Sequence, residues 1–137
     1  MVESEVFEVG LITEGIPIIR RQYFKSEDLS VNPILVGGFL SSIQSFDLYN
    51  KEEEIPQLIQ VSDYTIKLHR FTCGQTKSKF LLYVVCQVST EQIQKSIIDL
   101  AEILQTHDNI LLNWNLDTES LRNLNPVLDE KFHRFTS

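Results

Sequence analysis

The chain has 137 residues, of which 42% are hydrophobic and 23% charged, a balance typical of one globular domain and unlike that of a disordered chain. Its formal net charge of −7 disfavours binding to nucleic acid and to anionic membrane surfaces, and no segment approaches the ~20 apolar residues of a membrane span. We therefore expect one domain over residues 1–137, with no direct membrane insertion.

Two β-like runs near the start of the chain predict a hairpin. Val6–Thr13 and Pro17–Phe24 are rich in β-branched and aromatic residues, and the three residues between them include a glycine. Because Pro17 has no backbone N–H to donate to a ladder, its strand is expected at an edge of a sheet.

The next predicted element is a helix from Pro33 to about Asp47, with Asn32 as its N-cap. Its apolar residues cover more than the single stripe of a surface helix, so burial on two sides is expected. Gly37 and Gly38 each cost about 1 kcal/mol relative to alanine in a helix, which calls for close approach by another backbone. That backbone belongs either to the chain's own sheet or to a helix of a second subunit.

Three further strands are predicted: Gln57–Val61, Tyr64–Cys73 and Phe80–Val88. The last is almost continuously apolar, which is typical of a central strand covered on both faces. Cys73 and Cys86 show no metal-ligand or paired spacing, so they are interpreted as buried thiols in a reducing cytoplasm. The acidic start of the sequence lacks the pattern of a signal peptide, which agrees with a cytoplasmic location.

The rest of the chain is predicted to be helical. Residues 89–92 read Ser-Thr-Glu-Gln, the form of a capping box with Ser89 as N-cap, and a long helix with one apolar stripe follows. Asn125-Pro126 predicts the start of a last short helix, with Asp129 and Glu130 in its first turn. The element order is then β-β-α-β-β-β-α-α, which favours an α/β (α+β) three-layer sandwich around a five-stranded antiparallel sheet.

No motif for catalysis, cofactor binding or metal binding was found. The sequence has no phosphate-binding loop, nucleophile elbow, zinc-protease motif or C-x-x-C, and its three histidines lack partners at ligand spacing. The pair Arg20 and Arg21 is interpreted as solvated. Trp114 is predicted as a core residue or, alternatively, as an exposed binding anchor. We therefore predict no enzyme and no cofactor.

Several segments resemble longin-like and roadblock-like domains, particularly small archaeal-type members. The resemblance rests on the turn Gly15-Ile16-Pro17, the run Asn32–Phe46 with its core Gly37–Ile43, Val61–Tyr64, and Trp114–Asp117. It covers nearly the whole chain, although Leu116-Asp117 stands where a Gly-Asp is more usual in those domains.

The resemblance implies a five-stranded antiparallel sheet with one helix on one face and two on the other. It also implies a non-catalytic scaffold that forms a homodimer, or a heterodimer with a related domain, and that serves small GTPases in vesicle trafficking or motility. The helix over residues 33–46 would pack on its copy, and the strand Gln57–Val61 would extend the sheet. The predicted dimer or partner interface is Val36, Gly37, Gly38, Leu40, Ser41, Gln44, Gln57, Ile59 and Val61. The alternative function is a small-molecule-binding sensor, which predicts a cavity between sheet and helix.

Overall fold

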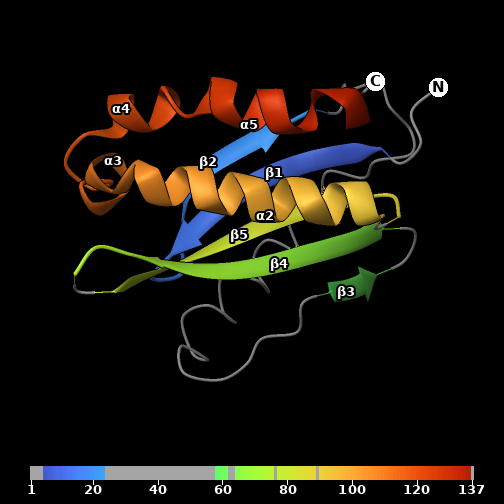
Figure 1. Cartoon of the computed structure of the whole chain (residues 1–137), viewed down its shortest axis with the longest axis horizontal. Coiled ribbons are helices and arrows are strands. Elements are labelled where there is room, and N and C mark those ends of the chain that lie inside the picture. The colour runs from blue at the N-terminus through green and yellow to red at the C-terminus, as the bar shows by residue number, and fades with distance from the viewer. Residues whose placement is uncertain (1–4, 24–57, 62–63, 76, 89, 137) are drawn as a thin grey trace.

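A computed structural model describes residues 5–23, 58–61, 64–75, 77–88 and 90–136 (Figure 1). Within these residues the chain forms one antiparallel sheet in the order β2-β1-β5-β4-β3. Four strands are long and one, β3, has only four residues at one edge of the sheet. The strands are β1 (Val6–Thr13), β2 (Ile16–Gln22), β3 (Leu58–Val61), β4 (Tyr64–Cys73) and β5 (Ser78–Cys86).

The two central strands, β1 and β5, carry the most apolar runs. Every residue of β1 is buried, and so are the last seven residues of β5. In β1, Val9 and Leu11 face the described helices, whereas Glu8 and Gly10 lie on the second face of the sheet, because successive strand residues alternate. On β1, the face toward the described helices is therefore apolar, whereas the second face carries a glutamate and a glycine.

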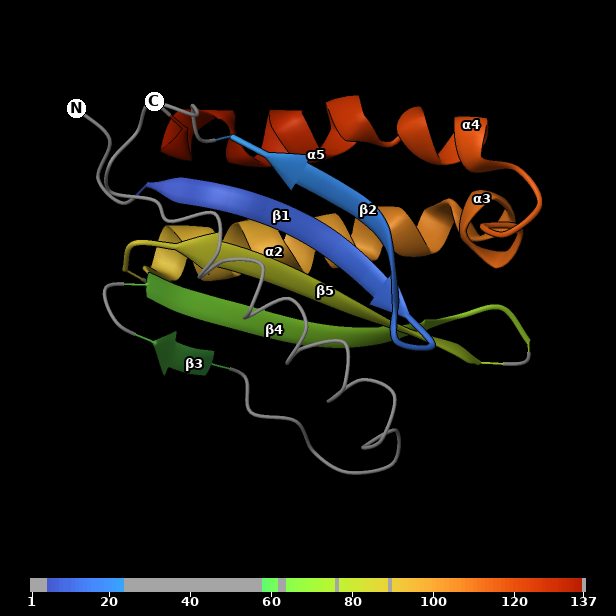
Figure 2. The same cartoon turned by 180° about the vertical axis from the view of Figure 1, so that it is seen from behind.

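The described helices all lie on one face of the sheet. They are in front of the sheet in Figure 1, and the view from behind shows the sheet in front of them (Figure 2). The long helix crosses the sheet, and the shorter ones lie beside it toward β2. They are α2 (Glu91–Thr106), α3 (Asp108–Leu112), α4 (Thr118–Arg122), α5 (Asn125–Phe132) and the 3-10 helix η1 (His133–Phe135).

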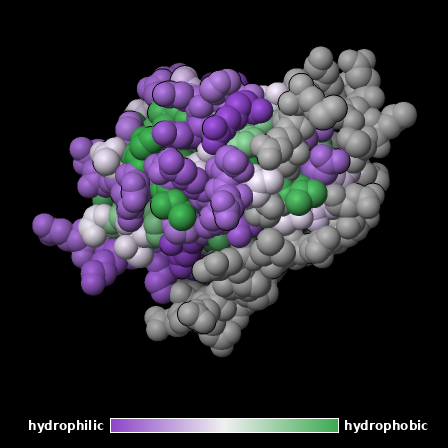
Figure 3. All heavy atoms as spheres, turned by 45° about the vertical axis from the view of Figure 1, so that its right-hand side comes forward, coloured by the Kyte–Doolittle hydropathy of each residue, from purple (hydrophilic) through white to green (hydrophobic). Residues whose placement is uncertain are grey.

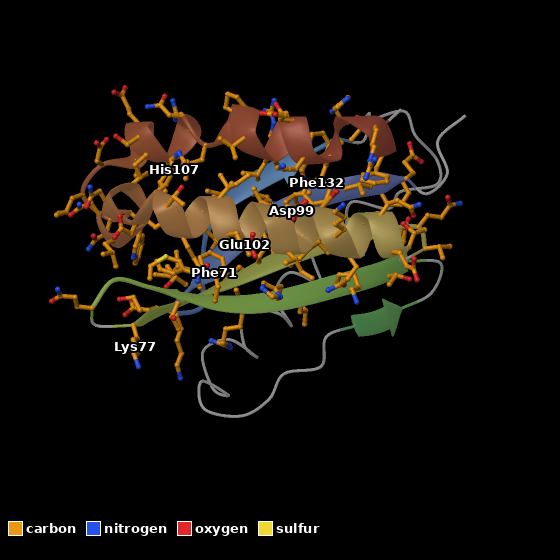
Figure 4. The ribbon with its side chains drawn as sticks, viewed as in Figure 1. Phe71, Lys77, Asp99, Glu102, His107 and Phe132 are labelled. Carbon is orange, nitrogen blue, oxygen red and sulfur yellow. The ribbon has the colours of Figure 1, made fainter. Side chains whose placement is uncertain are left out.

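The core fills the space between this helical layer and the sheet. Helix α2 presents the predicted apolar stripe, from Ile93 to Leu104, to the strands. Phe71 on β4 stacks on Phe80 of β5 with ring centroids 5.7 Å apart, and Phe132 on α5 is fully buried (Figure 4). Trp114 is half-buried and packs against this core, so it is neither a fully buried core residue nor a fully exposed side chain.

The predicted three-layer sandwich is wrong for the part of the chain that the structure describes. The described helices cover one face only, and the sheet has four long strands with a four-residue edge strand, which is a two-layer α+β arrangement. Continuous apolar strands predict that both faces are covered, but they do not predict which element covers them. The C-terminal part also divides into four helices and a 3-10 turn, where two helices were predicted.

Local signals predicted most elements and missed some caps. Thr90 is the N-cap of α2, and its side chain accepts a hydrogen bond from the N–H of Ile93, so the cap is one residue later than predicted. Helix α5 begins at Asn125, with Leu124 as its N-cap residue. Pro126 therefore lies in the first turn of the helix, where a proline is tolerated. The predicted helix over residues 33–47 lies outside the described residues.

Candidate functional site

A buried carboxylate organises the second face of the sheet. Glu8 on β1 is fully buried, and its oxygens accept hydrogen bonds from the hydroxyl of Tyr83 at 2.5 Å and from the amide of Gln22 at 3.0 Å. The Nε of Arg20 lies 3.2 Å from both carboxylate oxygens. Two strands, β2 and β5, thus contribute donors to a carboxylate on β1, the strand between them.

This cluster has the properties of a structural anchor. Burial and the adjacent carboxylate of Glu8 raise the pKa of the Tyr83 phenol, so the phenol stays protonated and donates its hydrogen. Glu8 is shielded from solvent and already accepts bonds from three side chains, which leaves little room for a substrate. Arg20 is 39% exposed, so only its Nε end is tied to the cluster.

A second polar cluster joins β2 to α5 on the helix side. Arg21 donates two hydrogen bonds of 2.9 Å to Asp129, and the hydroxyl of Tyr23 donates to the same carboxylate at 2.8 Å. Arg20 and Arg21 are 39% and 42% exposed, which agrees with their interpretation as solvated, but each guanidinium is also paired with an acid on another strand or helix, which the sequence did not predict. Asp129 likewise binds across the fold and does not serve the helix dipole of α5.

The Arg21–Asp129 pair should make a small, pH-dependent contribution to stability. Arg21 is the main cause that lowers the pKa of Asp129 below its ordinary value. A carboxyl group with a lowered folded pKa stabilises the protein above its unfolded pKa of ~3.9, and this stabilisation is lost as pH falls through the folded pKa. Asp129→Asn should lower the free energy of unfolding at pH 7 by at most about 1 kcal/mol, since both side chains are partly exposed.

Urea unfolding of the wild type and Asp129→Asn at pH 7 and near pH 2.5 measures this effect. The difference between the two proteins should shrink at the lower pH. The matched control is Glu130→Gln, which changes an exposed carboxylate on the same helix and should stay within about 0.5 kcal/mol of the wild type. A difference that is equal at both pH values would rule out the ion pair as its source.

A groove of about 600 Å³ runs beside β2, between this strand and the segment formed by the turn at Trp114, helix α4 and the start of α5. Its apolar surface includes Ile16, which is 46% exposed, and the half-buried Trp114. Its polar surface includes Arg20, tethered to Glu8, and the exposed Arg122 at the end of α4. The lining residues are Ile16, Pro17, Ile18, Ile19, Arg20, Trp114, Asn115, Thr118, Leu121, Arg122 and Asn125.

The turn after Trp114 positions one wall of this groove. Asp117 caps α4 by accepting a hydrogen bond from the N–H of Ser120 at 3.2 Å. Leu121 of that helix is buried in the core and fixes α4 against the sheet, while Arg122 beside it stays exposed. The Leu116-Asp117 departure from the family pattern is thus compatible with a capped turn, and Leu116 itself is 81% exposed.

Two residues of the predicted interface fall within the described residues. Ile59 and Val61 lie in β3, where they oppose Ile66 and Tyr64 of β4. The described residues pair with β3 on one side only, so it is an edge strand. The others lie outside the described residues: Val36, Gly37, Gly38, Leu40, Ser41, Gln44 and Gln57.

Glu8, Tyr83 and the groove were missed by sequence reasoning. A single glutamate within the apolar run Val6–Thr13 is the local sequence signal for the buried cluster. Cys73 and Cys86 are buried and unpaired, as predicted, and burial raises the pKa of Cys86 to about 12. Within the described ranges no group of three or more His, Cys, Asp or Glu side chains could hold a metal ion, and no helix is long and apolar enough to cross a membrane.

The helix side of the molecule offers mainly polar surface. The residues that are coloured in Figure 3 are mostly hydrophilic, with hydrophobic ones in small separate groups. No protein-family model matches the chain, and no curated protein matches it either. The sheet edges and the groove are therefore the features on which a functional argument has to rest.

Proposed function

We propose that this protein is a non-catalytic interaction scaffold of the cytoplasm that associates with a second copy, or with a related domain, through the β3 edge. The observation that carries the proposal is the position of β3 at the end of an antiparallel sheet, with its outer side unpaired among the described residues. Backbone N–H and C=O groups along such an edge are ready to pair with a strand from another chain.

The edge of β3 is too short to form the interface alone. Stable protein interfaces bury about 1,200–2,000 Å² in total, and a four-residue strand provides only a small part of that area. The over-apolar helix predicted over residues 33–47 is the natural source of the remaining area, and its Gly37-Gly38 pair would let two helices approach closely. The proposed interface therefore combines this helix with Ile59 and Val61.

Small GTPases are the proposed partner class for the assembled dimer. This part of the proposal rests on the resemblance to longin-like and roadblock-like domains. A panel of small GTPases, each loaded with GDP or with a non-hydrolysable GTP analogue, would test it by interferometry against the purified protein. Binding that depends on the bound nucleotide would support a regulatory platform, and no binding across the panel would count against this partner class.

The sensor alternative lacks a specific observation in its favour. It predicts a cavity between sheet and helix, but the centre of the interface between α2 and the sheet is filled by fully buried side chains such as Ile93, Leu100 and Leu104. A groove of about 550 Å³ between α2 and β4 opens to the surface and is not an enclosed cavity. The groove beside β2 likewise lies at the surface, along a strand edge. We therefore keep the scaffold as the proposed function.

Self-association is tested by light scattering coupled to size exclusion over a dilution series. The wild type should show about twice the monomer mass of 15.9 kDa. Alternate residues of an antiparallel strand direct their N–H groups outward, and the two-residue connection after Val61 assigns Gln60 to the outward set. Gln60→Pro removes that donor and should shift the protein toward the monomer mass.

Two further variants sharpen the test. Gln60→Thr keeps the N–H and should remain dimeric, while Gly38→Arg should abolish association if the helix contributes. Far-UV circular dichroism shows whether each variant is folded. A wild type that is monomeric at every concentration, or folded Gln60→Pro and Gly38→Arg variants that both remain fully dimeric, would refute the proposed interface.

A further inference from the structure

The opposite edge of the sheet, along β2, is also unpaired within the described residues. Strand β2 pairs only with β1. The N–H of Tyr23 donates to the carbonyl of Phe7 at 2.8 Å, so the N–H of Tyr23 points into the sheet, toward β1. Because bonded pairs alternate with non-bonded pairs, the backbone groups of Arg20 and Gln22 point outward from the sheet.

The groove beside this edge adds side-chain chemistry to the free backbone groups. It follows β2 from Ile16 to Arg20, and its far wall carries Trp114 and Arg122. Arg122 forms no ion pair among the described residues, whereas Arg20 is balanced by Glu8. In a chain with a net charge of −7, the groove thus exposes an uncompensated positive charge next to apolar surface.

We propose that the β2 groove binds an extended, acidic segment of a partner protein, which adds to the sheet as a further strand. Backbone hydrogen bonds to the outward groups of Arg20 would align the segment, and a carboxylate of the segment would pair with Arg122. Apolar side chains of the segment would contact Ile16 and Trp114. Main-chain pairing of this kind provides affinity, while the side-chain contacts provide specificity.

Charge and backbone chemistry favour an acidic partner over a second copy of this chain. Two β2 strands in antiparallel contact would place at one interface the Arg122 of both copies, which forms no ion pair within the described ranges, and like charges across an interface are unfavourable. Pro17 also lacks the N–H that self-pairing would use, a feature that protects natural edge strands. An acidic segment avoids the charge repulsion, and it can pair with β2 at Arg20 and Gln22, beyond the position of Pro17. This inference goes beyond the proposed function, because it concerns the edge opposite to β3.

Selection from a library of random nonapeptides displayed on phage tests the inference with the full chain as bait. The wild type should enrich peptides that carry Asp or Glu next to β-branched or aromatic residues. Arg122→Glu should lose these peptides and enrich ones with Lys or Arg in place of the acid. Lys95→Glu makes the same charge change on an exposed position of α2 and should select the same peptides as the wild type.

A synthetic peptide from the enriched set then locates the site. Its affinity should fall at least about tenfold for Arg122→Glu and stay unchanged for Lys95→Glu. The backbone amide of Arg20 should shift in the NMR spectrum on binding and become protected from hydrogen exchange. The proposal is overturned if no acidic motif is enriched, if both charge variants behave alike, or if the shifts map elsewhere.

The same variant separates this inference from the proposed self-association. Arg122→Glu should leave the mass measured by light scattering unchanged, because it lies at the edge opposite to β3. If Arg122→Glu converted a dimer to a monomer, the groove would be the interface between copies, and the acidic-partner proposal would be withdrawn.

Discussion

Replacing Glu8 by alanine should lower the free energy of unfolding by about 3–5 kcal/mol, the range found when one partner of a buried ion pair is removed. The carboxylate is fully buried and accepts hydrogen bonds from Tyr83, Arg20 and Gln22. Its loss leaves the buried phenol without an acceptor and removes the counter-charge of Arg20. Urea unfolding followed by circular dichroism at pH 7 gives the change directly.

A double-mutant cycle shows whether the cluster is the cause of this loss. Tyr83→Phe removes one neutral donor and should cost about 1–2 kcal/mol, since Glu8 keeps its other two donors. Glu8→Ala combined with Tyr83→Phe should cost clearly less than the sum of the single changes, because no buried phenol is then left without its acceptor. Additive effects, or a loss below about 1 kcal/mol for Glu8→Ala, would contradict the anchoring role.

The strands were predictable because their signals are local. β1 and β4 begin and end where the sequence predicted, since runs of β-branched and aromatic residues are bounded by turn residues on both sides. The position of β2 at an edge was predicted from Pro17 and is confirmed by the strand order.

The contacts that build the candidate site are not local, and for that reason the sequence did not predict them. Arg21 and Asp129 are 108 positions apart, and Glu8 and Tyr83 are 75 apart. Nothing in the neighbourhood of Arg21 indicates that its partner comes from the last helix. The groove has the same origin, because it exists only when β2 and the turn after Trp114 are brought together. The layer arrangement was mispredicted because apolar periodicity reports burial and not the element that covers a face.

Gly10→Ala should destabilise the protein by about 3 kcal/mol, at the upper end of the range for overpacked cores. A Cβ on Gly10 would lie 2.3 Å from Cε1 and Cζ of Tyr83 and 2.4 Å from its hydroxyl oxygen. The ring is 1% exposed and its hydroxyl is held by Glu8, so it has no space into which it can swing. At a strand position without such a clash, the change from glycine to alanine would favour the folded state by about 0.4–1 kcal/mol. A decrease in the free energy of unfolding, instead of an increase, would therefore identify the clash.

The background variant Tyr83→Ala provides the control, because it removes the ring that the new methyl group would meet. Gly10→Ala should be neutral or stabilising there, and a loss of equal size in both backgrounds would show that the ring is not responsible. The clash has a consequence for binding as well. Tyr83 and Arg20 share the carboxylate of Glu8, so a displaced ring would shift Glu8 and loosen the tether of Arg20 at the wall of the β2 groove. Gly10→Ala should therefore weaken binding of a selected acidic peptide even at temperatures where the variant is fully folded, which links the packing of the second face to the edge where a partner is proposed to bind.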